Sequence, residues 1–272
     1  MLTKANLYFF AVLTVILIAL QLLHLIPLGA ALLVLAFTLV LAAYKHSLSR
    51  ELSALTYVLW FLAIVLGVGV GLYRPAEFNY PSVFNVEALH EGGLPFNLYI
   101  NTAKLLAGYI IIFLLISNRK STSVFIQSRV NQMILAVVLG LSVVAVASQV
   151  LGLSFYLKEL HYVLLFGLVN LLVTCVSEEA FMRLLLQSQL QGFLARRIKS
   201  VLWLEAIPLL VATLIFILTH SVSNLNMIVA FGFAGFTYGL VYSFTKNVWA
   251  CVTAHFVVNI VHFALLTYPL AK

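Results

Sequence analysis

The sequence predicts an all-α membrane protein, a polytopic transmembrane helical bundle of about eight or nine spans. Of its 272 residues, 64% are hydrophobic and only 8% are charged, whereas a soluble domain carries about 25% charged residues. The apolar residues are also gathered into runs close to the roughly 20 residues that a helix needs to cross a bilayer. Lipid is therefore the expected surrounding of most of the chain.

The apolar runs define the expected spans. The second run is short. The first is too long for a signal-peptide core and lacks a small-residue cleavage site, so we expect it to remain in the protein as a span. In order, the runs are residues 7–26, 30–44, 54–73, 98–117, 133–153, 162–187, 201–219, 227–244 and 248–268.

Basic residues between the runs predict the orientation, because lysine and arginine in short loops favour the cytoplasmic side. They fall in alternate loops, whereas the long intervening loop 74–97 holds three glutamates and one arginine. We therefore expect an integral protein of a bacterial cytoplasmic membrane, with a cytoplasmic N-terminus and loop 74–97 outside. The expected cytoplasmic residues are Lys4, Lys45, Arg50, Arg119, Lys120, Arg129, Arg196, Arg197, Lys199 and Lys246.

The charges also limit the partners. A net charge of +7 would suggest nucleic acid in a soluble chain. Here the basic residues lie in short loops between spans, so we expect membrane lipids and no nucleic acid, with segment 118–129 contacting anionic lipids. Lys104, in the outer part of the fourth run, is expected to extend its ammonium to the membrane interface. Cys175 and Cys251 are expected to be buried free thiols.

An acidic stretch interrupts the sixth run with Glu178, Glu179 and Arg183. Charged residues at the centre of a span cost about 2.5 to 3.5 kcal/mol each and usually serve a function. On a helix, Glu179 and Arg183 are four residues apart with the acid first, which favours an ion pair. Glu178 is rotated by roughly 100° from Glu179. One carboxylate is therefore expected to be neutralised, and the other is left for chemistry.

Further polar residues occur at the end of the seventh run and within the ninth. His220 follows the seventh run, and His255 and Asn259 lie on one helical face of the ninth, with His262 continuing the same stripe. Each alone has a structural explanation, such as a hydrogen bond between neighbouring helices. Together with the acidic stretch, they place chemistry-bearing side chains on three spans, which favours a functional site.

Three motifs occur in order along the chain: Glu-Glu-x-x-x-Arg, Phe-x-x-x-His and His-x-x-x-Asn. This ordered trio resembles the CAAX protease and bacteriocin-processing (CPBP, or Abi-type) family of intramembrane endopeptidases, similar to type II CAAX prenyl proteases. The resemblance covers about residues 160–265. It divides the chain into N-terminal transmembrane helices without a motif, residues 1–130, and a catalytic helical core, residues 131–272. Leu184 stands where the family often has glycine.

Peptide hydrolysis needs an activated water and a group that stabilises the oxyanion. No serine or cysteine lies beside a motif histidine, so a covalent nucleophile is not supported. We expect Glu178 to act as general base and His220 to orient or activate the water. His255 and Asn259 would hold the oxyanion or the scissile carbonyl, and the acid–arginine pair would fix the helix. The resemblance agrees with these roles.

Several alternatives remain open from the sequence. Glu178, His220, His255 and Asn259 could bind a divalent metal such as zinc, although no His-Glu-x-x-His helix is present. The substrate would be a peptide or protein at the membrane, a lipidated one included. A non-catalytic immunity factor or scaffold that keeps the site for binding is the main competing function. A proton-coupled transporter is less favoured, because the polar groups are confined to one half of the chain.

One geometric condition accompanies the protease hypothesis. Glu178 lies within its run, whereas a straight seventh span beginning at residue 201 would carry His220 to the outer face. Convergence of the two side chains therefore predicts a later start of this span, near Pro208, with residues 199–205 along the interface. The resulting pocket is expected to open toward the cytosolic leaflet.

Overall fold

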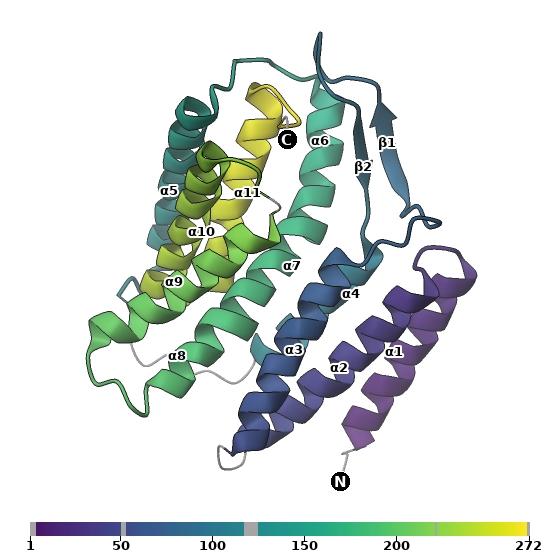
Figure 1. The fold of residues 1–272 in the computed structure, drawn as a ribbon, viewed down its shortest axis with the longest axis vertical. Helices are drawn as coiled ribbons and strands as arrows, with labels where there is room; N and C mark the ends of the chain where they lie inside the picture. Colours follow the sequence, from purple (N-terminus) through teal and green to yellow (C-terminus); the bar gives the residue numbers. More distant parts are fainter. Residues whose placement is uncertain (1–3, 50–52, 117–124, 221, 271–272) are drawn as a thin grey trace.

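The structure, a computed structural model, describes residues 4–49, 53–116, 125–220 and 222–270. Over this part the chain is mostly helical, and its helices pack into a bundle with a two-stranded hairpin at one end (Figure 1). Seven helices are long and apolar enough to cross a membrane, and two shorter apolar helices, Tyr8–Leu22 and Thr102–Leu115, accompany them. The predicted helical class with several membrane-spanning helices is confirmed. The seven candidate spans in the described residues are fewer than the expected eight or nine, because the helices in the first and fourth apolar runs are too short to count as spans.

The N-terminal part contains four helices and the hairpin. They are α1 (Lys4–Leu22), α2 (Leu28–Leu48), α3 (Ala54–Leu72), β1 (Ser82–Val86), β2 (Phe96–Tyr99) and α4 (Thr102–Leu115). The strands pair antiparallel, with Val86 opposite Phe96. The sequence predicted only a loop here, because strands of five and four residues leave too short a pattern. Apolar side chains of the hairpin, such as Phe84, pack with Tyr162 and Phe166 of a neighbouring helix.

The C-terminal part contains α5 (Arg129–Leu151), a 35-residue helix from Leu160 to Leu194, α9 (Val201–Thr219), α10 (Leu225–Thr245) and α11 (Val248–Leu265). The division of the chain near residue 130 into two domains stays a prediction. The long helix changes its winding along its length, and such π-helical turns are frequent at functional sites. Its segments are α6 (Leu160–Val169), the π-helix η2 (Asn170–Cys175), α7 (Val176–Glu179), the π-helix η3 (Ala180–Gln187) and α8 (Ser188–Leu194).

Helix α9 corrects one expectation. It is continuous from Val201 to Thr219 with Pro208 inside it, so the predicted break near Pro208 is wrong. Figure 1 shows α9 inclined to α10, against which it packs. Its C-terminal end therefore reaches the interior of the bundle without a break. Helix inclination is set by packing against neighbours, which residue counting along one span does not include.

The two ends of the bundle differ in charge. The end that we call the basic end carries Lys45, Arg129, Arg196, Arg197, Lys199 and Lys246. The opposite end, which we call the hairpin end, carries β1, β2 and the glutamates Glu77, Glu87, Glu91 and Glu159 alongside Arg74 and Lys158. Residues 117–124, which include most of the segment expected to contact lipids, lie outside the described residues.

Candidate functional site

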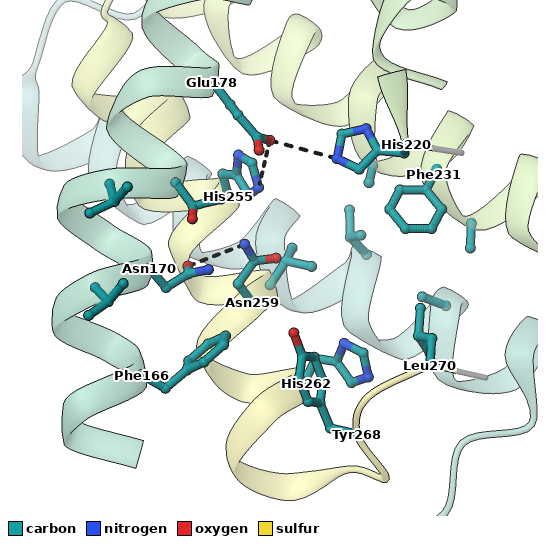
Figure 2. A pocket seen from close by; sticks show the side chains of 18 of the residues that line it. Phe166, Asn170, Glu178, His220, Phe231, His255, Asn259, His262, Tyr268 and Leu270 are labelled. Carbon is teal, nitrogen blue, oxygen red and sulfur yellow. Dashed lines mark hydrogen bonds and ion pairs between the residues drawn. The ribbon is translucent and has the colours of Figure 1, made fainter. Parts of the chain in front are cut away.

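A cavity of about 490 Å³ extends from the middle of the bundle toward the hairpin end. Its lining comes from α5, the long interrupted helix, α9, α10 and α11, and from β2 and the C-terminal segment after α11. Figure 2 shows the predicted site residues Glu178, His220, His255 and Asn259 around it. The three predicted motifs therefore face one common space.

Glu178 is the centre of the site. Its Oε1 accepts a hydrogen bond from Lys104 Nζ at 2.5 Å. Its Oε2 lies 3.7 Å from His220 Nε2 and 3.9 Å from His255 Nε2, both beyond direct hydrogen-bond distance (Figure 2). Within the described residues, Oε2 is buried and has no hydrogen-bond partner. One carboxylate oxygen is thus held by a cation, and the other is open between two imidazoles.

The position of Lys104 differs from the expectation. Its side chain was predicted to reach the membrane interface, but it is only 22% exposed and pairs with Glu178. The reason is tertiary. Helix α4 packs against α7, where Gly108 faces Ser177 so closely that a Cβ at that glycine would collide with it. This approach places an ammonium on α4 next to a buried carboxylate, and a buried charge is best stabilised by an opposite one.

Glu179 is fully buried and bonded on both oxygens. Arg183 Nε donates to its Oε2 at 2.8 Å, which confirms the ion pair predicted from the four-residue spacing. His255 Nδ1 lies 2.9 Å from its Oε1. Arg183 also donates to Gln187 Oε1 at 2.7 Å. The pair therefore connects the long helix with α11 and fixes the orientation of the His255 ring.

The two histidine rings have the same orientation relative to Glu178, with Nδ1 turned away from it and Nε2 toward it. His255 Nδ1 faces the Glu179 carboxylate, and His220 Nδ1 lies 2.6 Å from the carbonyl oxygen of Phe216. Both partners only accept hydrogen bonds, so both Nδ1 atoms are assigned the proton. The Nε2 atoms are left to face Glu178. The ring of Tyr238 stacks on His255 at 4.7 Å between centroids and holds it in place.

Asn259 lies one helical turn from His255 toward the hairpin end. Its Nδ2 donates to Asn170 Oδ1 at 3.2 Å, and Cys175 Sγ donates to the same oxygen at 3.0 Å. Asn259 therefore shares the cavity with Glu178 but is already tied to the long helix (Figure 2). His262 lines the cavity farther out, with its Nε2 at 3.3 Å from the Thr267 carbonyl oxygen. Cys175 and Cys251 are buried free thiols, as predicted.

Sequence reasoning missed three residues that contact the site. Lys104 was assigned to the interface, and Asn170 and Tyr238 were not singled out. Asn170 was detectable in principle, because an asparagine inside a span usually finds a partner on another helix. No sequence pattern marks Tyr238 as a site residue, since aromatic residues are common in membrane spans.

The donors do not match a metal centre. In the described part of the chain, His, Cys, Asp and Glu side chains do not form a group of three or more that could hold a metal ion. Zinc needs about four ligands within roughly 2.0 to 2.3 Å of the ion. Here Glu178 already pairs with the ammonium of Lys104, and Asn259 is bonded to Asn170. These residues do not fit a metal centre, so we assign no chemical step to a metal.

Comparison with known proteins agrees with the geometry. Residues 160–261 match the family model described as type II CAAX prenyl endopeptidase, Rce1-like. The matched segment includes Glu178, His220, His255 and Asn259, and it leaves out Lys104. Neither the curated proteins nor the solved structures gave a match to the chain.

Proposed function

Because residues 160–261 form a domain of the Rce1-like type II CAAX prenyl endopeptidase family, a family of proteases, we propose that this chain is an intramembrane endopeptidase. It hydrolyses a peptide bond of a membrane-associated peptide by direct attack of an activated water. The observation that carries the proposal is the open Oε2 of Glu178, which lies between two histidine Nε2 atoms at 3.7 and 3.9 Å.

The spacing around Glu178 suits a water molecule. Gaps of 3.7 and 3.9 Å are too long for direct bonds, but one water can bond to the carboxylate and to an imidazole at about 2.8 Å from each. Glu178 removes a proton from this water as the water oxygen attacks the scissile carbonyl carbon. His220, fixed through Nδ1 by Phe216, orients the water. The proton then passes to the leaving amine nitrogen, which completes the hydrolysis.

The tetrahedral intermediate carries a negative oxygen that needs donors. His255 can supply its Nε2–H when the ring is protonated, with Glu179 balancing the imidazolium through Nδ1 at 2.9 Å. Asn259 donates one amide hydrogen to Asn170 at 3.2 Å and has a second hydrogen for the substrate. The bond to Asn170 restricts the rotation of this amide and favours a fixed direction for the remaining donor.

Two charged groups support the reactive carboxylate without entering the reaction. Lys104, bonded to Oε1 at 2.5 Å, favours the ionised form of Glu178 that a general base needs. Arg183 neutralises Glu179, so that the second acid does not compete for that role. Arg183 and Glu179 are both 0% exposed, which supports a positioning role for them rather than contact with the substrate.

A non-catalytic immunity factor or scaffold is the alternative. It would keep the same cavity for binding, and it needs no open oxygen on Glu178. The two functions therefore differ in their need for this oxygen, because only the protease requires a carboxylate at residue 178.

The experiment compares two glutamates that each pair with a lysine and are exposed to a similar degree. Glu178 and Glu205 each pair with a lysine at 2.5 Å, and their side chains are 18% and 15% exposed. Glu205 pairs with Lys246 at the basic end. In a reconstituted cleavage assay, E178Q should lower kcat by about 10²- to 10⁴-fold, the range for a general base, and E205Q should stay near the wild type. Cleavage by E178Q at the wild-type rate would overturn the role of Glu178 as general base, and no cleavage by the folded wild type would favour the scaffold function instead.

A further inference from the structure

The charges at the two ends of the bundle give its direction in the membrane. Six described lysines and arginines lie at the basic end, against Arg74 and Lys158 at the hairpin end, which also carries four glutamates. Lysine and arginine in short loops favour the cytoplasm. The basic end is therefore the cytoplasmic one, and the hairpin end faces the opposite side of the membrane.

The cavity extends from the middle of the bundle to the hairpin end. Glu178 lies near the middle of the 35-residue helix, roughly 27 Å along the axis from Leu160 and roughly 24 Å from Leu194. From this depth the cavity extends to Asn97 of β2 and to Tyr268 after α11, both of which line it. Figure 2 shows the same course, from Glu178 past Asn259 to Tyr268 and Leu270.

The path from Glu178 toward the basic end is packed. The next turns of the long helix place Arg183 and Gln187 there, at 0% and 2% exposure. Gln187 Nε2 donates to the Gly239 carbonyl oxygen at 3.1 Å and to Ser243 Oγ at 3.2 Å, which joins the long helix to α10. Satisfied buried polar groups of this kind are costly to separate. The cavity therefore does not continue to the basic end, which argues against the expectation of a pocket that opens toward the cytosolic leaflet.

We infer that substrate reaches Glu178 from the extracytoplasmic side, and that the substrate is an extended peptide segment presented at that face. The inference rests on the proposed function for its cleavage step, and on the two ends of the bundle for its direction. The cavity volume of about 490 Å³ lies within the roughly 300 to 1,000 Å³ of ordinary ligand pockets. It admits a few residues of extended chain and excludes a folded domain.

Thiol labelling tests the direction without relying on activity. Single cysteines are placed at the cavity mouth (Asn97→Cys), on its wall (Val258→Cys) and at the basic end (Lys199→Cys). The wild-type protein is the control for background labelling, because its two cysteines, Cys175 and Cys251, are both 0% exposed. A small membrane-impermeant thiol reagent is added to right-side-out and to inverted membrane vesicles. We expect the first two variants to react in right-side-out vesicles and Lys199→Cys to react in inverted vesicles.

Each outcome decides the inference. Reaction of Asn97→Cys and Val258→Cys in inverted vesicles, or of Val258→Cys in neither orientation while Lys199→Cys reacts, overturns it. The two cavity variants are independent, so misfolding of one, detected by its elution in detergent, leaves the other to decide. The proposed function fails separately. If labelling follows the expected pattern but a peptide supplied outside right-side-out vesicles stays intact, the access route stands and the peptidase proposal does not.

Discussion

Lys104 provides the sharpest test of how the N-terminal helices contribute to the site. It lies on α4, outside the matched segment 160–261, yet its ammonium is 2.5 Å from Glu178 Oε1. Lys104→Met removes the charge and keeps much of the apolar side chain. A buried carboxylate without its partner is destabilised, so the general base should lose its ionised form and its fixed orientation.

The expected loss of activity in Lys104→Met follows from the distance and the exposure of the Lys104–Glu178 pair. Two unit charges about 4 Å apart interact by about 4 kcal/mol at an effective dielectric constant of about 20. The two side chains are 22% and 18% exposed, so water replaces part of the lost ammonium. We therefore expect a loss of about 3 kcal/mol of transition-state stabilisation, which corresponds to a fall of about 150-fold in kcat/KM.

The assay measures kcat/KM of the reconstituted protein with a peptide substrate, and thermal unfolding shows that each variant is folded. Lys104→Arg keeps the positive charge and should stay within about tenfold of the wild type. Lys199→Met, at an exposed position of the basic end, controls for the loss of a lysine. A folded Lys104→Met protein with wild-type kcat/KM would refute the assignment of Lys104 as a positioning residue.

Two further outcomes follow from the structure. Burial lowers the pKa of Lys158 from 10.5 to about 8; between these pH values the unfolded chain binds a proton that the folded protein has lost, so stability should rise with pH over that window. Thermal unfolding from pH 8 to 10.5 should show this rise in the wild type and a smaller one in Lys158→Met, and equal slopes would contradict it. Prolonged dialysis against a chelator should leave the cleavage rate unchanged, because Glu178 is paired with an ammonium; a loss that zinc restores would show that a metal takes part.

The sequence predicted features that depend on local geometry or on bulk solvation. The apolar runs predicted the helices, because crossing a bilayer needs a length of apolar chain that is visible in one segment. The pair of Glu179 and Arg183 was predicted because four residues of helix suffice to bring these side chains together. Glu178 was separated from that pair by the same argument.

The remaining features depend on how helices pack. The bond between Lys104 and Glu178 joins residues 74 positions apart, and no pattern within either helix predicts it. The inclination of α9, which brings His220 to Glu178, is set by neighbouring helices rather than by Pro208. The direction of the cavity likewise required knowing which side of the Glu178 layer is filled by Arg183 and Gln187.

In the proposed mechanism, water held by Glu178 attacks the peptide bond directly. A single-turnover reaction in H₂¹⁸O, analysed by mass spectrometry of both product and enzyme, tests this claim. Direct attack predicts one ¹⁸O atom in the new carboxylate of the product and none in the peptide that contains Glu178. Incorporation of ¹⁸O into the Glu178 side chain, with unlabelled product in the first turnover, would instead show that the carboxylate forms a covalent intermediate.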